Sequence, residues 1–204
     1  DRAHYLPNFV SGSPAVPLSR EMFYTPSDAP LLLALGRLHE NKAFDVLLEA
    51  LTRIPNAYLW LAGEGPKRDE LENYAEKLGV KPRVRFLGWR DDTDSLLASC
   101  DVFVCPSRHE PLGNVVVEAW AQSKPVVAAD SLGPGVLIDQ GKNGVLVPIN
   151  DSLSLAYGIQ NLLGDKDLCS AIALEGYESY QRHFTQSKAV QNYVSFFENL
   201  MDKD

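Results

Sequence analysis

An uninterrupted run of apolar residues from Leu31 to Leu35, ending at Gly36, constrains the fold most strongly. Strands that alternate apolar and polar residues have one face in water, whereas a continuous apolar run is typical of a parallel strand buried on both faces. Within a few residues the spacing changes, and Phe44, Leu47, Leu48 and Leu51 recur on one side of a predicted helix over residues 42–53. A buried strand followed by an amphipathic helix is the first part of a βαβ unit.

The same alternation continues along most of the chain. Further strands are predicted at 58–62, 84–87, 102–105, 125–129 and 144–147, and helices at 66–78, 94–99 and 114–122. Strands separated by helices indicate a parallel sheet with helices on both faces. The predicted fold class is therefore α/β, a doubly wound parallel sheet of the Rossmann-like type.

Three regions are predicted from the change in pattern. Residues 1–26 lack clear periodicity and are expected to be a linker that leads into the sheet domain of residues 27–150. Residues 151–204 contain three helical patterns without a strand between them. The last helix carries an apolar stripe, which is expected to pack on the core, or alternatively to meet a second domain. The stripe consists of Val190, Tyr193, Val194, Phe197 and Met201.

Charge and cysteine content exclude several classes of function. The chain of 204 residues has 19 Lys and Arg against 27 Asp and Glu, a net charge of −8, with no basic run. Such a chain is a poor candidate for nucleic-acid binding or for an anionic membrane surface. No apolar stretch approaches the roughly 20 residues of a membrane span. Three cysteines without a CxxC motif predict reduced thiols in a cytosolic protein.

Ligands of doubly wound sheets bind outside the carboxyl ends of the strands, which here lead into loops at 36–41, 63–66, 88–93 and 106–113. In the first loop, Gly36 allows a tight turn, and Arg37 and Lys42 flank the start of a helix. Two cations beside a helix N-terminus suit a phosphate group. A solvated turn with two ordinary surface charges explains the same residues equally well. The loop lacks GxGxxG, which weakens a dinucleotide-binding interpretation.

The fourth loop provides two carboxylates. Glu110 lies in the loop, and Asn114 and Glu118 share one face of the next helix. Gly113 would allow a ligand to approach the backbone. Two ionised carboxylates suit vicinal hydroxyl groups because they only accept hydrogen bonds. Taken alone, a carboxylate favoured by the helix dipole plus one exposed glutamate is the preferred explanation.

The two remaining loops give weaker signals. Glu64 is interpreted first as part of a strand-to-helix turn and second as a ribose contact. Gly88-Trp89-Arg90 is either a wall for a base or a half-buried tryptophan beside a strand end. Asp92-Thr93-Asp94 has the spacing of a metal-binding pair, but we interpret it as a helix N-cap and predict no metal site. The four histidines lack the spacing of zinc ligands.

In order along the chain, these segments resemble the C-terminal, donor-binding domain of retaining glycosyltransferases of the GT-B fold, family 4, also described as glycosyl transferases group 1. The resemblance covers nearly the whole chain, and its specificity comes from the ordered occurrence of short motifs. The motifs are Gly36-Arg37-Leu38 with Lys42, Ala62-Gly63-Glu64-Gly65-Pro66, Arg85-Phe86-Leu87-Gly88, Asp101-Val102-Phe103-Val104, Pro106-Ser107, the segment from Glu110 to Glu118, Lys124-Pro125-Val126-Val127 and Asn143-Gly144-Val145-Leu146-Val147-Pro148.

The resemblance implies a nucleotide-sugar donor and no cofactor or metal. Arg37 and Lys42, beside Gly36, would hold the diphosphate, while Glu110 would contact the sugar and Glu118 the ribose. Arg37, Lys42 and Glu110 are the implied catalytic residues. Backbone at Leu112, Gly113 and Asn114 would contact sugar and phosphate, and the loop of Gly88, Trp89 and Arg90 would meet the base.

The resemblance also implies partners and a pathway. An N-terminal Rossmann-like domain of the same protein would hold the acceptor, so the fragment alone is expected to transfer no sugar. The expected reaction moves a hexose-type sugar to a glycan or lipid-linked acceptor in bacterial surface polysaccharide or lipopolysaccharide synthesis. The expected location is cytoplasmic, with membrane contact at the inner membrane only through the other half.

Two alternatives stay open. Another GT-B enzyme, such as a sugar-nucleotide epimerase, shares the expected fold but would not favour the combination of Arg37 and Lys42 with the two glutamates. A non-catalytic Rossmann-type nucleotide-binding module is disfavoured by the absent GxGxxG. The chain also departs from the family pattern at Ala43 and Ser123, where glycine is usual, and at Val136, where glutamate is common. The first two departures are expected to be tolerated if their backbone angles are ordinary.

Overall fold

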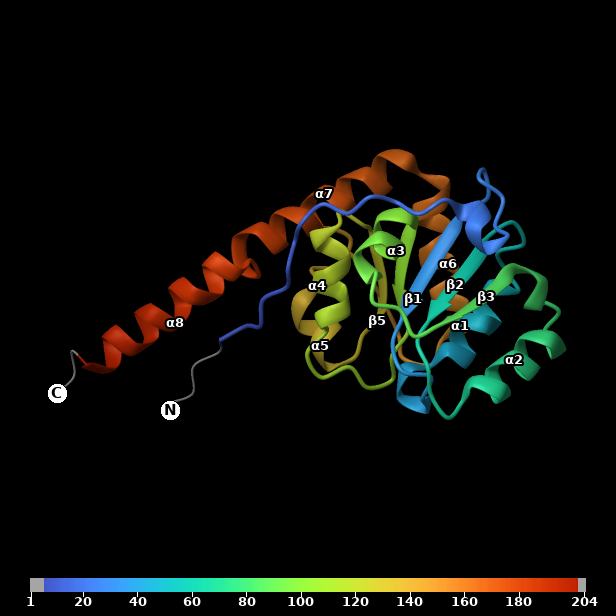
Figure 1. Cartoon of the computed structure of the whole chain (residues 1–204), viewed down its shortest axis with the longest axis horizontal. Helices are drawn as coiled ribbons and strands as arrows, with labels where there is room; N and C mark the ends of the chain where they lie inside the picture. Colours follow the sequence, from blue (N-terminus) through green and yellow to red (C-terminus); the bar gives the residue numbers. More distant parts are fainter. Residues whose placement is uncertain (1–5, 202–204) are drawn as a thin grey trace.

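The computed structural model describes residues 6–201, which form a six-stranded, fully parallel sheet with helices on both faces (Figure 1). The strand order is β3-β2-β1-β4-β5-β6. This order confirms the predicted doubly wound sheet, and it reverses direction between β1 and β4. The strands are β1 (Leu31–Leu35), β2 (Tyr58–Ala62), β3 (Val84–Gly88), β4 (Val102–Cys105), β5 (Val126–Ala129) and β6 (Val145–Val147).

The helices agree with the predicted ones to within a few residues, with one addition, α5. They are α1 (Phe44–Leu51), α2 (Arg68–Lys77), α3 (Thr93–Ser99), α4 (Asn114–Ala121), α5 (Leu132–Leu137), α6 (Ser152–Gly164), α7 (Lys166–His183) and α8 (Gln186–Met201). The sequence of α5, Leu-Gly-Pro-Gly-Val-Leu, reads as a turn because glycine and proline are poor helix formers. Its Gly133 is needed for packing, since a Cβ there would lie 2.5 Å from the amide nitrogen of Gly113.

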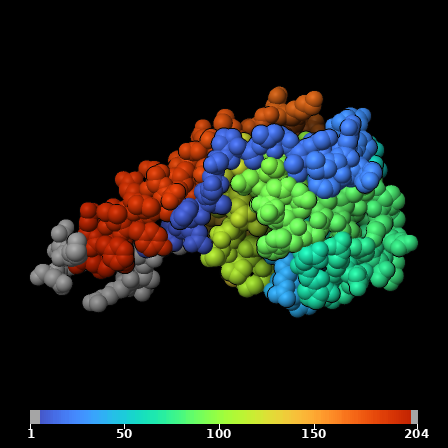
Figure 2. Space-filling view, in the orientation of Figure 1, coloured from blue at the N-terminus to red at the C-terminus, as the bar shows by residue number. Residues whose placement is uncertain are grey.

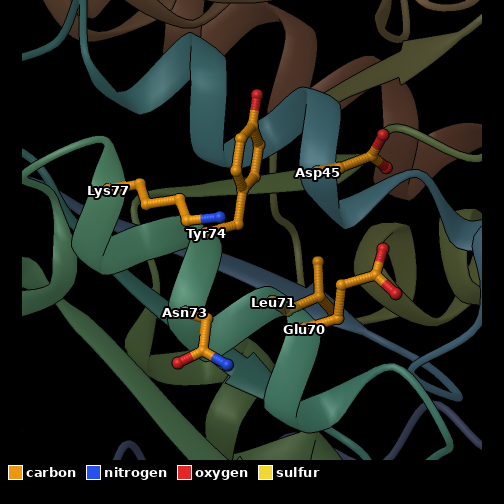
Figure 3. A pocket seen from close by; sticks show the side chains of 6 residues that line it. All are labelled: Asp45, Glu70, Leu71, Asn73, Tyr74 and Lys77. Carbon is orange, nitrogen blue, oxygen red and sulfur yellow. The ribbon is translucent and has the colours of Figure 1, made fainter.

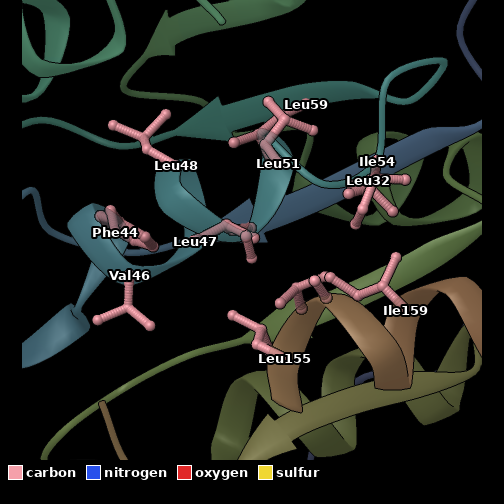
Figure 4. Close-up of a cluster of buried hydrophobic side chains, with 14 of the residues drawn as sticks. Leu32, Phe44, Val46, Leu47, Leu48, Leu51, Ile54, Leu59, Leu155 and Ile159 are labelled. Atoms are coloured by element: carbon pink, nitrogen blue, oxygen red, sulfur yellow. The ribbon is translucent and has the colours of Figure 1, made fainter. Parts of the chain in front are cut away.

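The sheet separates two buried clusters, which explains the continuous apolar run in β1. Successive side chains of a strand point to opposite faces, so Leu32 faces one cluster and Leu33 the other. The first cluster packs α1, α2 and α6 on the sheet and includes Leu47 and Ile159 (Figure 4). The second packs α3, α4 and the end of α7 around Trp120.

The described part of the predicted linker, residues 6–26, packs along the face of the sheet that carries the second cluster. The Val10 amide donates to the Phe184 carbonyl at 3.1 Å, and the Tyr180 hydroxyl donates to the Val10 carbonyl at 3.3 Å. Further along, Arg20 pairs with Asp101 at 2.7 Å. A short 3-10 helix, Arg20–Phe23, then leads towards β1.

Helix α8 extends away from the sheet, beside the N-terminal segment (Figure 2). The expectation that its apolar stripe packs on the core is wrong for the described side chains, because their exposed fractions run from 44% at Tyr193 to 56% at Phe197. The side chain of Met201 lies outside the described residues. No helix within residues 6–201 combines the length and apolar character that crossing a membrane requires.

Two departures from the family pattern have unusual backbone angles. Ala43 has φ +51° and Ser123 has φ +54°, both in the left-handed region that favours glycine. Tolerance of these two residues was expected only if their backbone angles were ordinary, and the angles are not ordinary. The backbone at each position adopts a conformation that costs an L-residue free energy, and the two sites differ in the burial of the side chain.

Candidate functional site

Three of the four predicted loops meet the start of α4 in one cleft at the point where the strand order reverses. Residues 106–113 of the fourth predicted loop, Glu110 included, do not line this cleft, and neither does Lys42. The cleft has a volume of about 510 Å³. It is lined by residues that follow β1, β2 and β3, together with the first turns of α3 and α4. The lining residues are Leu35, Gly36, Arg37, Ala62, Gly63, Glu64, Gly65, Trp89, Arg90, Thr93, Val115 and Glu118. A doubly wound sheet is expected to bind its ligand at this place.

A second groove, of about 580 Å³, lies between α1 and α2 (Figure 3). Its lining comes from these two helices alone, away from the strand-end loops. Several of its polar groups are already engaged within the protein: Asp45 pairs with Arg108 at 2.5 Å, and the Tyr74 hydroxyl donates to Glu49 at 2.5 Å. The strand-end cleft is the better candidate site despite its smaller volume, because it combines the topological position with unpaired polar groups.

The loop after β1 provides two cations in different environments, of which only Arg37 lines the cleft. Arg37 is exposed and makes no ion pair or hydrogen bond with the described residues. Lys42 lies at the end of a 3-10 turn (Glu40–Lys42), and its side chain passes over Gly36, where a Cβ would lie 2.9 Å from Lys42 Cε. Lys42 Nζ donates to Glu110 Oε2 at 2.5 Å. The fixed positive charge of Lys42 is thus shared with a carboxylate, while that of Arg37 faces solvent.

Glu118 lies one turn into α4 and carries the clearest electrostatic perturbation of the cleft. Burial raises the pKa of its carboxyl above the ordinary value, and the negative charges of Asp94 and Glu110 raise the pKa further, against a lowering by Lys42. Its side chain makes no hydrogen bond or ion pair within residues 6–201. A half-buried acceptor without a partner among the described residues is suited to hydroxyl groups of a ligand.

The loop after β3 differs from its prediction in two respects. Trp89 is 81% exposed at the rim of the cleft, which excludes a half-buried structural tryptophan. Asp92 precedes α3 as expected of an N-cap, but its carboxylate makes no capping bond. Asp92 instead holds the Arg90 guanidinium through two hydrogen bonds of 2.8 and 2.5 Å. Arg90 also lies 5.4 Å above the ring of Phe23.

The predicted residues at the start of α4 are close to the cleft without lining it. Gly113 is buried with φ +71°, and a Cβ there would lie 2.7 Å from Leu137 Cδ1. The requirement for glycine at position 113 is therefore explained by its packing against α5 and is not evidence for ligand access alone. Leu112 is 59% exposed, and Asn114 is exposed at the first position of α4.

Three further residues line the cleft in addition to those that the sequence predicts as site residues. Glu64 lines the cleft and pairs with Arg68 at 2.7 Å, although the turn interpretation was preferred for it. Thr93 and Val115 line the cleft from the first turns of α3 and α4. Their positions directly after strand-end loops were the signal that could have identified them. Within residues 6–201, no group of three or more potential metal-ligating side chains gathers.

Comparison with known proteins agrees with the geometry. Residues 18–179 match the family described as glycosyl transferases group 1. The chain is 43% identical over 92% of its length to the lipopolysaccharide core biosynthesis glycosyltransferase LpsE of Rhizobium meliloti (strain 1021), and 35% identical over 96% to LpsD of the same strain. It spans 55% and 57% of those two proteins.

Among solved structures, the chain is similar to Anabaena Alr3699/HepE, determined in complex with UDP and glucose. The TM-score is 0.82 with 29% sequence identity, and the match covers 88% of this chain and 50% of the other. The sheet is a Rossmann-like half of a GT-B fold followed by a helical C-terminal region. With the family match over most of its length, the chain belongs to the glycosyl transferases group 1 family.

Proposed function

We propose that this chain is the donor-binding half of a retaining glycosyltransferase that uses a nucleotide sugar. The observation that carries the proposal is the strand-end cleft, which combines a cation, Arg37, with a half-buried acceptor, Glu118, neither of which has a partner among residues 6–201. In this assignment Arg37 and Lys42 bind the diphosphate and stabilise the charge of the leaving nucleotide. Fixed cations in a shielded site can supply this stabilisation without a resident metal.

The remaining contacts divide the donor among neighbouring groups. Glu118 accepts hydrogen bonds from the ribose hydroxyls, and Glu110 accepts from the sugar. Trp89 and the backbone beside it form a wall for the base. The backbone at Leu112, Gly113 and Asn114 lies next to the sugar and phosphate. HepE, similar in structure, was determined with UDP, which makes a uridine nucleotide the first ligand to test.

The proposed reaction transfers a hexose-type sugar to a glycan or lipid-linked acceptor in surface polysaccharide or lipopolysaccharide synthesis. The support is the likeness to two proteins described as lipopolysaccharide core biosynthesis glycosyltransferases. A cytoplasmic location is part of the same proposal and agrees with buried, unbridged Cys100 and Cys105.

We further propose that the acceptor is held by an N-terminal half of the full-length enzyme, which packs on α8. The support is the exposed apolar stripe on α8, a helix that extends away from the sheet (Figure 1). Tyr193→Asp combined with Phe197→Asp should leave the melting temperature of the 204-residue chain unchanged. The same changes should lower the stability and activity of the full-length enzyme. Loss of stability in the short chain would contradict this assignment.

The donor site is tested by thermal shift with UDP, GDP, ADP and NAD, each at about 1 mM with EDTA present. A ligand at 100 times its Kd stabilises a protein by about 2.7 kcal/mol. Stabilisation by one nucleoside diphosphate, lost in Lys42→Ala and in Glu118→Ala, is the expected result. Lys77→Ala, on the separate groove, is the matched control for Lys42. Stabilisation by NAD alone would favour a Rossmann-type module, and sugar transfer by the 204-residue chain alone would refute its dependence on a second half.

A further inference from the structure

We infer that Glu110 makes the diphosphate site selective for a sugar-bearing nucleotide over the bare nucleoside diphosphate, by competing with the diphosphate for Lys42. This inference rests on the proposed function and deepens it. The consequence is directional: the site holds the donor and releases the product that has lost its sugar.

The ion pair between Lys42 and Glu110 is the basis of the inference. It joins the loop after β1 to the loop after β4, across the reversal of strand order. Only 20% of the Lys42 side chain and 11% of the Glu110 side chain are exposed. The two loops are held together also by the His109 amide, which donates to the Asn41 carbonyl at 3.2 Å. The pair is therefore part of a fixed contact between the two loops, next to Gly36, which lines the cleft.

The competition follows from the charges. A diphosphate that binds Lys42 brings negative charge next to the Glu110 carboxylate and draws the ammonium away from it. Taking one partner from a largely buried ion pair leaves an uncompensated charge, which is strongly unfavourable. A nucleoside diphosphate has no group near Glu110 that can compensate, so part of its attraction to Lys42 is offset.

A sugar on the diphosphate changes this balance. Its hydroxyl groups donate hydrogen bonds, and an ionised carboxylate only accepts them. Glu110 can then exchange Lys42 for hydroxyl donors while Lys42 turns to the phosphate. Hydrogen bonds to a charged group are stronger than neutral ones. The sugar thus improves diphosphate binding indirectly, in addition to its own contacts.

Other charges of the cleft do not share this arrangement. Arg37 has no partner among the described residues, so no carboxylate of the chain competes with a diphosphate for it. Glu118 makes no ion pair with Lys42, and Glu64 is held by Arg68. The discrimination is therefore specific to Glu110. Glu64 is a suitable control because it is a carboxylate at the same edge of the sheet that is paired with a different cation, Arg68.

Calorimetric titration with UDP and UDP-glucose, and with the corresponding guanosine and adenosine pairs, tests the inference. The wild-type chain should bind the sugar nucleotide more tightly than the diphosphate. Glu110→Gln should tighten diphosphate binding about tenfold, equivalent to about 1.4 kcal/mol, and reduce the preference for the sugar nucleotide. Glu110→Asp keeps the charge but withdraws it from Lys42, and should give a smaller change in the same direction.

Glu64→Gln should leave the ratio of the two affinities unchanged. Equal tightening in Glu64→Gln and Glu110→Gln would overturn the inference in favour of general charge relief in the cleft. Unchanged or weaker diphosphate binding in folded Glu110→Gln and Glu110→Asp would also overturn it, while the proposed function would stand. Failure of the wild-type chain to bind any nucleotide would overturn the proposed function itself, and the inference with it.

Discussion

Replacement of Ser123 by glycine should stabilise the protein, because the structure places this residue where glycine is favoured. Ser123 follows the end of α4 with φ +54°. Its amide donates to the Trp120 carbonyl at 2.9 Å, and the Lys124 amide donates to the Ala119 carbonyl at 2.9 Å. These two bonds form a Schellman motif, in which the residue in the Ser123 position is usually glycine.

The expected gain is the difference of two effects. The left-handed conformation costs an L-residue roughly 1–2 kcal/mol. Glycine increases the entropy of the unfolded chain, which costs about 0.4–1 kcal/mol. The Ser123 side chain is exposed, so its loss removes no buried contact. Ser123→Gly should therefore raise the free energy of unfolding by about 0.5–1 kcal/mol, a rise in melting temperature of about 1–4 °C for a domain of this size.

Ala43 provides the matched comparison, since it has nearly the same φ with the opposite burial. Its side chain is 0% exposed, so Ala43→Gly also loses a buried methyl group worth about 0.8 kcal/mol. This loss cancels the relief of strain, and little net change is expected. Urea denaturation followed by circular dichroism measures both variants. A destabilised Ser123→Gly, or an Ala43→Gly stabilised more than it, would refute the reasoning.

Three other substitutions probe the cleft and the nearby core. Glu118→Gln should raise the stability at neutral pH and weaken nucleotide binding. Because the pKa of the Glu118 carboxyl is raised in the native state, the stability of the wild type should fall as the pH rises from the pKa in the unfolded chain through the pKa in the native state. This dependence on pH should be absent in the variant. Ser131→Ala should be neutral or stabilising by about 1 kcal/mol in urea denaturation, because the buried hydroxyl has no hydrogen-bond partner within residues 6–201. Trp89→Ala should leave the melting temperature unchanged while weakening nucleotide binding in calorimetry by about 1–3 kcal/mol, if the exposed ring stacks on the base.

The location of the cleft was predictable from the sequence because it depends on local patterns. The apolar runs identify the parallel strands, and parallel strands place all their carboxyl ends at one edge of the sheet. Once the strand ends are known, the sequence predicts which residues lie at that edge, among them Arg37, Trp89 and Glu118. Each of them lines the cleft.

The pairing of charges within the cleft was not predictable in the same way. Lys42 and Glu110 are 68 residues apart, and each was assigned separately to a ligand. Asp92 had two suitable partners, the helix amides of α3 and the Arg90 guanidinium. In the structure the Asp92 carboxylate pairs with the Arg90 guanidinium, which lies above the ring of Phe23. Phe23 comes from the N-terminal segment, whose place on the sheet has no periodic signal.

Helix α8 shows a different limit of sequence reasoning. Apolar residues at helical spacing indicate a face to be buried, but they do not say what covers it. Both buried clusters are covered without α8: Ile159 of α6 packs in the cluster on one face of the sheet, and Tyr180 of α7 packs in the cluster on the other face. A helix that adds 16 residues beyond a filled core exposes its stripe until another surface covers it. The conflict between the local pattern and the observed exposure is thus the strongest reason, independent of any relative, to expect that another surface packs on α8.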